Sequence, residues 1–103
     1  MPELLSVVVD KNVTMTCPVH PDTDPPPSIV WYMTGQQLQE DQRVFVSDNG
    51  RILTLTRAKV ADEARYRCVA TNVAGEIDKM FDLEVQGRSA LQAYSFGGFF
   101  LWS

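Results

Sequence analysis

Asp62-Glu63-Ala64-Arg65-Tyr66-Arg67-Cys68-Val69-Ala70 is the stretch of this sequence that decides the fold. Its apolar residues predict a β-strand with one buried face. Tyr66, Cys68 and Ala70 share the buried face. Val13-Thr14-Met15-Thr16-Cys17-Pro18-Val19 alternates between apolar and polar residues and places Cys17 on its inner face. The two cysteines therefore point inward from two strands and could face each other across a sandwich.

Cys17 and Cys68 are the only cysteines of the chain. Two cysteines are too few for a structural zinc site, and no histidine pair completes one. A Cys-x-x-Cys redox motif is absent. One disulfide or two buried thiols remain, and the inward positions in two strands favour the disulfide. A loop of this length, once closed, would stabilise the fold by roughly 4 kcal/mol in the chain-entropy model.

Further short apolar segments predict a chain made of strands. Asp48-Asn49-Gly50 and Asn72-Val73-Ala74-Gly75 have the residues of hairpin turns, because Asn and Gly tolerate positive φ. Residues 58–63 form a polar corner, and no helix of ordinary length is predicted. Short strands at regular spacing with turn signals indicate an all-β sandwich. The strands are predicted at 4–9, 13–19, 29–33, 44–46, 52–56, 64–71 and 76–85, with a polar edge segment at 36–42.

The composition of the chain argues against several classes of function. The chain has 103 residues, one histidine and a formal net charge of −4. An acidic balance argues against nucleic acid, which needs clustered Lys and Arg. No apolar run is long enough for membrane insertion. Met1-Pro2-Glu3 lacks the features of a signal peptide, so we expect the chain to be a segment of a longer protein. A single histidine makes metal-binding and catalytic triads implausible, and we expect no enzyme activity, metal or cofactor.

The quoted residues together resemble the immunoglobulin superfamily. The resemblance rests on Cys17, on Trp31 fourteen residues later, on Leu53-Thr54-Leu55 and on the stretch from Asp62 to Cys68. Cys…Trp…Cys with a tyrosine two residues before the second cysteine is the signature of this sandwich. The turn at 72–75 is similar to the Asn-x-x-Gly turn of the I-set. The resemblance implies an I-set domain over residues 1–86.

Roles for several residues follow from the resemblance. It implies two antiparallel sheets joined by a Cys17–Cys68 disulfide, with Trp31 packed on it and Leu55 in the core. The Tyr66 hydroxyl should bond backbone in the corner at 58–63. Asp62 should accept hydrogen bonds or pair with a cation, for which Arg43 is the candidate.

Gly50-Arg51-Ile52-Leu53-Thr54-Leu55-Thr56-Arg57-Ala58 and Cys68-Val69-Ala70-Thr71-Asn72 look most similar to the tandem I-set repeats of hemicentins. Hemicentins are long extracellular matrix proteins, so the resemblance implies a secreted matrix or adhesion module. Such a module would be a rigid spacer and a protein-binding surface, with neighbouring domains among its partners and chain ends at opposite poles. Titin, obscurin and myosin light-chain kinase carry similar domains inside the cell, where the cysteines would stay reduced. A receptor ectodomain is a third possibility.

Three surface features are candidate sites. Asn12-Val13-Thr14 is an N-glycosylation sequon in a turn, and Asn12 is the candidate acceptor. His20, Asp22 and Asp24 cluster in a proline-rich loop, but they offer too few oxygens for calcium, so we predict a solvated loop. Four arginines (Arg51, Arg57, Arg65 and Arg67) could suggest a basic patch, yet we predict solvated faces with carboxylate partners.

Residues 87–103 form an apolar, aromatic tail outside the predicted domain. The tail holds five of the ten aromatic residues: Tyr94, Phe96, Phe99, Phe100 and Trp102. It is either an end unrelated to the fold, such as read-through or an unusual splice end, or a docking segment. In the second case we expect residues 94–102 to lie as a strand on a sheet edge, and self-association could result.

Overall fold

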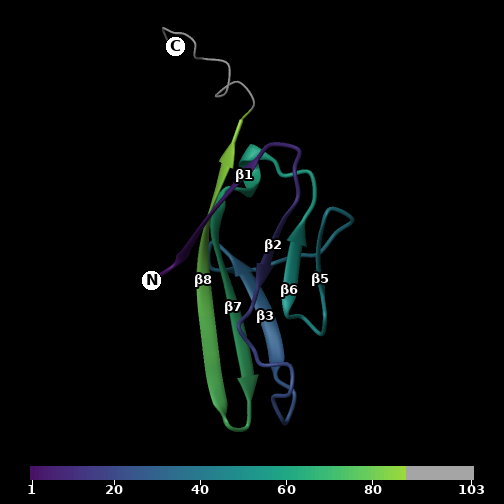
Figure 1. Cartoon of the computed structure of the whole chain (residues 1–103), viewed down its shortest axis with the longest axis vertical. Coiled ribbons are helices and arrows are strands. Elements are labelled where there is room, and N and C mark those ends of the chain that lie inside the picture. The colour runs from purple at the N-terminus through teal and green to yellow at the C-terminus, as the bar shows by residue number, and fades with distance from the viewer. Residues whose placement is uncertain (88–103) are drawn as a thin grey trace, which may run out of the picture.

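The computed structural model describes residues 1–87, which form two β-sheets packed face to face (Figure 1). The larger sheet has the strand order β1-β8-β7-β3-β4, and the smaller sheet has the order β2-β6-β5. The all-β sandwich predicted from the sequence is confirmed. The strands of the larger sheet are β1 (Glu3–Val8), β8 (Gly75–Gln86), β7 (Ala64–Asn72), β3 (Ser28–Met33) and β4 (Gln36–Gln37), and those of the smaller sheet are β2 (Val13–Thr16), β6 (Ile52–Leu55) and β5 (Val44–Ser47).

One strand pair departs from the prediction of two antiparallel sheets. β1 pairs with β8 in parallel, with Glu3 opposite Phe81 and Val8 opposite Gln86. All the other pairs are antiparallel. Because Glu3 lies beside the middle of β8, the first strand begins part-way along the sandwich, as Figure 1 shows. We predicted that the two chain ends lie at opposite poles of the sandwich. In the described residues the amino end instead lies beside the middle of β8, so this prediction is wrong for that end.

Element boundaries differ from the predictions by a few residues. The strand predicted at 13–19 ends at Thr16, since Pro18 has no amide hydrogen to continue the ladder. The polar edge segment at 36–42 contains only the two-residue strand β4. The corner at 58–63 contains a turn of 3₁₀ helix, Val60–Asp62. The described residues contain no helix long and apolar enough to cross a membrane.

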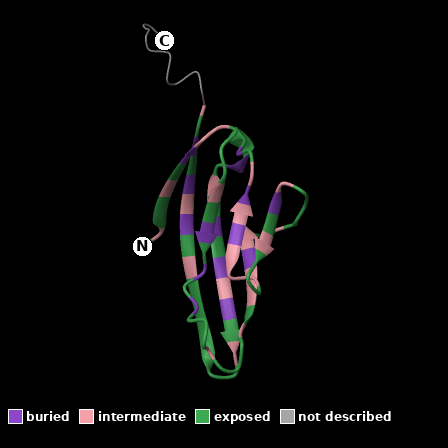
Figure 2. Cartoon of the chain, turned by 45° about the vertical axis from the view of Figure 1, so that its right-hand side comes forward, coloured by how far each residue is buried: buried purple, intermediate pink, exposed green. Residues whose placement is uncertain are grey.

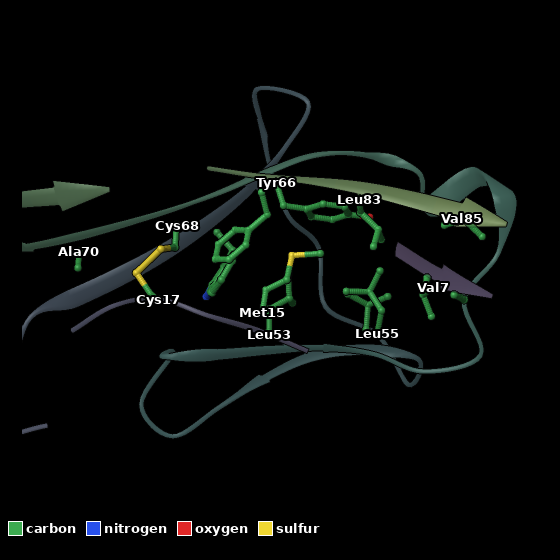
Figure 3. Close-up of a cluster of buried hydrophobic side chains, with 14 of the residues drawn as sticks. Val7, Met15, Cys17, Leu53, Leu55, Tyr66, Cys68, Ala70, Leu83 and Val85 are labelled. Atoms are coloured by element: carbon green, nitrogen blue, oxygen red, sulfur yellow. A yellow bond between two sulfur atoms is a disulfide. The ribbon is translucent and has the colours of Figure 1, made fainter. Parts of the chain in front are cut away.

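The core lies between the two sheets and follows the alternation of the sequence. Buried and exposed residues alternate along β7 and along the second half of β8 (Figure 2). Side chains from the inner faces meet in one cluster (Figure 3). Its largest fully buried members are Tyr66, Phe81, Met15, Leu53, Leu55, Cys17 and Cys68.

The turn between β5 and β6 shows why its sequence contains Asn-Gly. Asp48, Asn49 and Gly50 all have positive φ, at 55°, 59° and 90°. A Cβ added to Gly50 would lie 3.2 Å from the Cβ of Ile29. Glycine is therefore required here by both backbone conformation and space.

Candidate functional site

The disulfide joins the two sheets at the centre of the molecule, as the sequence predicted. Cys17 directly follows β2 and Cys68 lies in β7, with 5.9 Å between their Cα atoms. Both cysteines are completely buried. The Cα separation is typical of disulfides, so the geometry suits a bridge that ties one sheet to the other.

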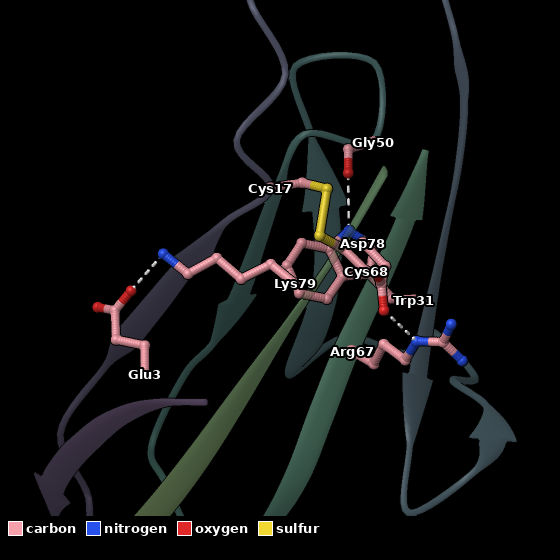
Figure 4. Close-up of a disulfide and its surroundings, with 8 residues drawn as sticks. All are labelled: Glu3, Cys17, Trp31, Gly50, Arg67, Cys68, Asp78 and Lys79. Carbon is pink, nitrogen blue, oxygen red and sulfur yellow. Dashed lines mark hydrogen bonds and ion pairs between the residues drawn. A yellow bond between two sulfur atoms is a disulfide. The ribbon is translucent and has the colours of Figure 1, made fainter. Parts of the chain in front are cut away.

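Trp31 lies beside this disulfide on β3 and is 4% exposed (Figure 4). Its indole Nε1–H donates a hydrogen bond of 2.7 Å to the carbonyl oxygen of Gly50. The indole also stacks on Phe81, with 5.8 Å between ring centroids. The side chain thus links β3 to the turn of the opposite sheet, a polar contact that sequence reasoning missed.

A charged pair covers the Phe81 side of this cluster. The Lys79 ammonium lies 5.2 Å from the centre of the Phe81 ring and 2.6 Å from a Glu3 carboxylate oxygen. Figure 4 shows the Glu3–Lys79 pair connecting the first strand to the last. The amino end of β1 is held to β8 by this pair as well as by backbone pairing.

The corner before β7 is organised by Asp62. The Tyr66 hydroxyl donates a buried hydrogen bond of 2.6 Å to the Asp62 carbonyl oxygen. Arg43 donates two hydrogen bonds to the Asp62 carboxylate, at 2.7 and 3.0 Å, and the Lys59 amide donates a third at 2.8 Å. Asp62 thus lies in the corner, the Tyr66 hydroxyl bonds its backbone from β7, and Arg43 is the cation beside it.

The electrostatics of the corner follow from this geometry. Burial alone would raise the pKa of the Asp62 carboxyl, but the hydrogen bonds from Arg43 and from the Lys59 amide outweigh burial and lower it. Burial raises the pKa of the Tyr66 hydroxyl, with a further contribution from the Asp62 charge. The corner is therefore stable with an ionised carboxylate and a protonated phenol.

The outer face of the larger sheet carries cross-strand ion pairs. Arg65 donates to Asp82 at 2.7 and 3.0 Å, and Arg67 donates to Asp78 at 2.9 Å. Arg51 pairs with Asp48 in the β5–β6 turn at 2.6 Å. These three arginines have carboxylate partners, as predicted. They therefore do not form an unpaired basic patch.

Apolar side chains are interspersed with the charged pairs of this face. Val30 lies opposite Val69, while Arg67 lies between Tyr32 and Met80. Val30, Tyr32 and Val69 are half-buried, and Met80 is exposed. The face thus combines apolar side chains with charged groups of both signs.

The loops at one end of the sandwich are joined by side-chain hydrogen bonds. The Asn72 side-chain amide donates to the Pro25 carbonyl at 2.9 Å, which connects the β7–β8 turn to the proline-rich loop. In that loop the Nδ1 atom of His20 accepts a hydrogen bond from the Asp22 amide at 3.1 Å. Within residues 1–87, no three His, Cys, Asp or Glu side chains are grouped so that they could hold a metal ion.

Asn12 lies exposed in the turn between β1 and β2. Its side-chain oxygen accepts a hydrogen bond of 3.0 Å from the Arg57 amide. Arg57 has positive φ, so this bond helps to hold an unusual backbone conformation. An N-linked glycan would attach to the side-chain nitrogen of Asn12. The hydrogen bond to the Arg57 amide uses the side-chain oxygen, so it is compatible with glycosylation.

Comparison with protein families identifies the fold. A family model described as the immunoglobulin I-set domain matches residues 1–85. The chain belongs to the immunoglobulin I-set family. This I-set domain is 37% identical to mouse hemicentin-1 over 81% of the chain, and 41% identical to mouse hemicentin-2 over 76%. The matches span only 1% and 2% of those proteins.

Solved structures of muscle proteins have a similar fold. A crystal structure of the complex between titin M10 and an Ig domain of obscurin-like 1 superposes with a TM-score of 0.73 and 33% identity. That superposition covers 84% of this chain and 88% of the other. The resemblance to hemicentin repeats is confirmed, and the fold is also similar to that in a titin M10–obscurin-like 1 complex.

The aromatic tail residues lie outside the described part of the chain. Tyr94, Phe96, Phe99, Phe100 and Trp102 all belong to residues 88–103. Their docking on a sheet edge therefore stays a prediction.

Proposed function

We propose that this I-set domain is a non-enzymatic module of an extracellular matrix or cell-adhesion protein, where it acts as a spacer and a protein-binding surface. The observation that carries the proposal is the buried Cys17–Cys68 bridge in a domain whose relatives include hemicentins. Disulfides persist in secreted proteins and are rare in the cytosol. The hemicentin resemblance adds the matrix setting.

The spacer role is supported by the way the domain is held together. Two sheets joined by a disulfide, by the Trp31–Gly50 hydrogen bond and by the Arg43–Asp62 pair form a unit with few internal degrees of freedom. The domain matches only a small fraction of each hemicentin sequence, which is consistent with one domain among many in a long chain. We propose residues 1–86 as that unit, with the tail outside it.

The binding surface is proposed on the outer face of β3, β7 and β8. Its apolar side chains, Val30, Tyr32, Val69 and Met80, lie among paired charges. A neighbouring immunoglobulin domain or another protein would contact these side chains. Self-association through the tail is a separate proposal, and light scattering of the full chain measures it.

Glycosylation of Asn12 and an extracellular location form the testable part of the proposal. On protein from its native tissue, enzymatic removal of N-glycans should shift the mass, and Asn12 should be converted to Asp. Antibody should also stain the tissue without permeabilisation. Staining only after permeabilisation, with unmodified Asn12, would contradict the proposal.

A second candidate is an intracellular muscle or cytoskeletal domain. The likeness to the titin M10 complex favours it. In that setting Cys17 and Cys68 would be buried thiols. Permeabilisation-dependent staining in register with the sarcomere would support this candidate.

A further inference from the structure

β5 is an edge strand of the smaller sheet, and β6 is its neighbour on one side only (Figure 1). The Arg43 carbonyl accepts a hydrogen bond of 2.9 Å from the Thr56 amide. Alternation along an antiparallel pair then turns the backbone groups of Phe45 toward β6 as well. The amides and carbonyls of Val44 and Val46 therefore point away from β6, to the outer side of the edge.

The segment just before β5 occupies this outer side. The Val44 amide donates to the Asp41 carboxylate at 2.8 Å, and the Val44 carbonyl accepts the Asp41 amide at 2.8 Å. The Val46 amide donates to the Glu40 carboxylate at 3.0 Å. Asp41 thus makes both hydrogen bonds that an antiparallel neighbour would make to Val44, and Glu40 supplies the next acceptor. The two acidic residues take the place of a neighbouring strand, which protects the edge from other chains.

Residues 39–42, which we call the cap, can move without opening the core. All four side chains of the cap are exposed, and the cap forms neither helix nor strand. The residue before it, Leu38, is packed against the core, and its amide donates to the Trp31 carbonyl at 2.9 Å. Segments with few buried contacts and exposed hydrogen bonds open at a low cost in free energy. Displacement of the cap would free Val44 and Val46 while Leu38 stays in place.

The freed edge is complementary to a copy of itself. In antiparallel pairing centred on Phe45, Val44 of each copy would lie opposite Val46 of the other, and the two residues would exchange hydrogen bonds. Phe45 would then lie opposite its counterpart, at a position where facing side chains approach closely. Phe45 is 37% exposed, so its ring is available for such an aromatic cross-strand pair. Valine and phenylalanine also favour strands.

We propose that β5 is a dimerisation edge held closed by the cap, and that displacement of the cap lets β5 pair antiparallel with β5 of a second copy of this chain. The strand is short, so the contact would bury little area and the dimer would be weak. The cap is tethered to β5 and competes at an effective concentration of roughly millimolar order. The closed form therefore prevails in dilute protein. The contact uses the same surface on both copies, so it ends at a dimer.

Light scattering and amide hydrogen exchange of the full chain over a concentration series test this proposal. Glu40→Ala/Asp41→Ala removes both carboxylate acceptors, and its mass should rise with concentration to twice that of the wild-type chain. Its Val44 and Val46 amides should exchange about 10-fold more slowly in concentrated than in dilute protein. The matched control, Glu40→Gln/Asp41→Asn, loses the same charges but keeps oxygen acceptors, and should keep the wild-type mass. The tail is identical in all these proteins, so the comparison isolates the cap.

A change on the strand gives an independent result. Phe45→Lys, added to the alanine double variant, should restore the wild-type mass because two lysines would face each other, whereas Phe45→Tyr should not. A folded alanine double variant that keeps the wild-type mass at every concentration would overturn the proposal. So would equal association of the alanine and the amide double variants, since charge alone would then be the cause. If near-UV circular dichroism shows that the double variant is unfolded, Glu40→Ala alone, which frees the Val46 amide, is held to the same outcomes.

Discussion

Replacing Tyr66 with Phe removes one oxygen atom and one buried hydrogen bond. The hydroxyl is buried and donates to the Asp62 carbonyl at 2.6 Å. A typical net hydrogen bond contributes about 0.5–1.5 kcal/mol, and an acceptor left unsatisfied in a buried site adds to the cost. We therefore expect a loss of about 1–2 kcal/mol in the free energy of unfolding, which lowers the Tm of a domain of this size by roughly 4–16 °C.

Urea denaturation at pH 7, followed by far-UV circular dichroism, measures this loss. Tyr32→Phe is the matched control, because it makes the same chemical change on the half-buried outer face of β3, and it should change the free energy by less than about 0.5 kcal/mol. An equal effect of the two substitutions, or no effect of Tyr66→Phe, would refute the argument that this hydrogen bond holds the corner.

Three further predictions concern the pH response, the core and one turn. Because the pKa of Asp62 is lowered in the folded state, its contribution to stability is present above the unfolded pKa near 3.9 and is lost as pH falls further; urea curves from pH 7 to 3 should show this loss, and Asp62→Asn should flatten it. Trp31→Ala should cost about 3–5 kcal/mol through cavity formation, read from the same urea curves, and a cost below about 1 kcal/mol would contradict the packing described. Gly50→Ala should lower the Tm more than Gly35→Ala, because both have positive φ but only Gly50 would place a Cβ against Ile29; equal melting temperatures would contradict the close approach.

The sequence predicted the strands and the disulfide because both depend on local alternation. Residues 64–71 alternate except at Val69, and the observed strand is one residue longer and ends at Asn72. The inward position of Cys17 and Cys68 followed from the same parity, and the bridge is present. Local pattern sufficed where one face of a strand is buried and the other is exposed.

Partner choice between distant segments could not be predicted in the same way. The run Leu4 to Val9 is apolar except for Ser6, so its sequence does not say which strand it pairs with, or in which direction. The structure pairs it in parallel with β8. The Trp31–Gly50 hydrogen bond likewise depends on how a turn of one sheet meets a strand of the other.

The protected β5 edge was missed for a related reason. Glu40 and Asp41 carry no pattern that separates an edge-capping carboxylate from a solvated one. The position of these two residues just before a short strand was a usable signal. Carboxylates at that position can accept hydrogen bonds from the outward backbone amides of the strand.

The state of Cys17 and Cys68 in the protein purified from its native source, under conditions that trap thiols before lysis, tests the central claim most directly. In an extracellular I-set module with a Cys17–Cys68 bridge neither cysteine reacts with a thiol reagent after denaturation, and the digest contains the two cysteine peptides linked to each other. Reaction of both Cys17 and Cys68 in the denatured protein would contradict the account and assign the domain to a reducing compartment.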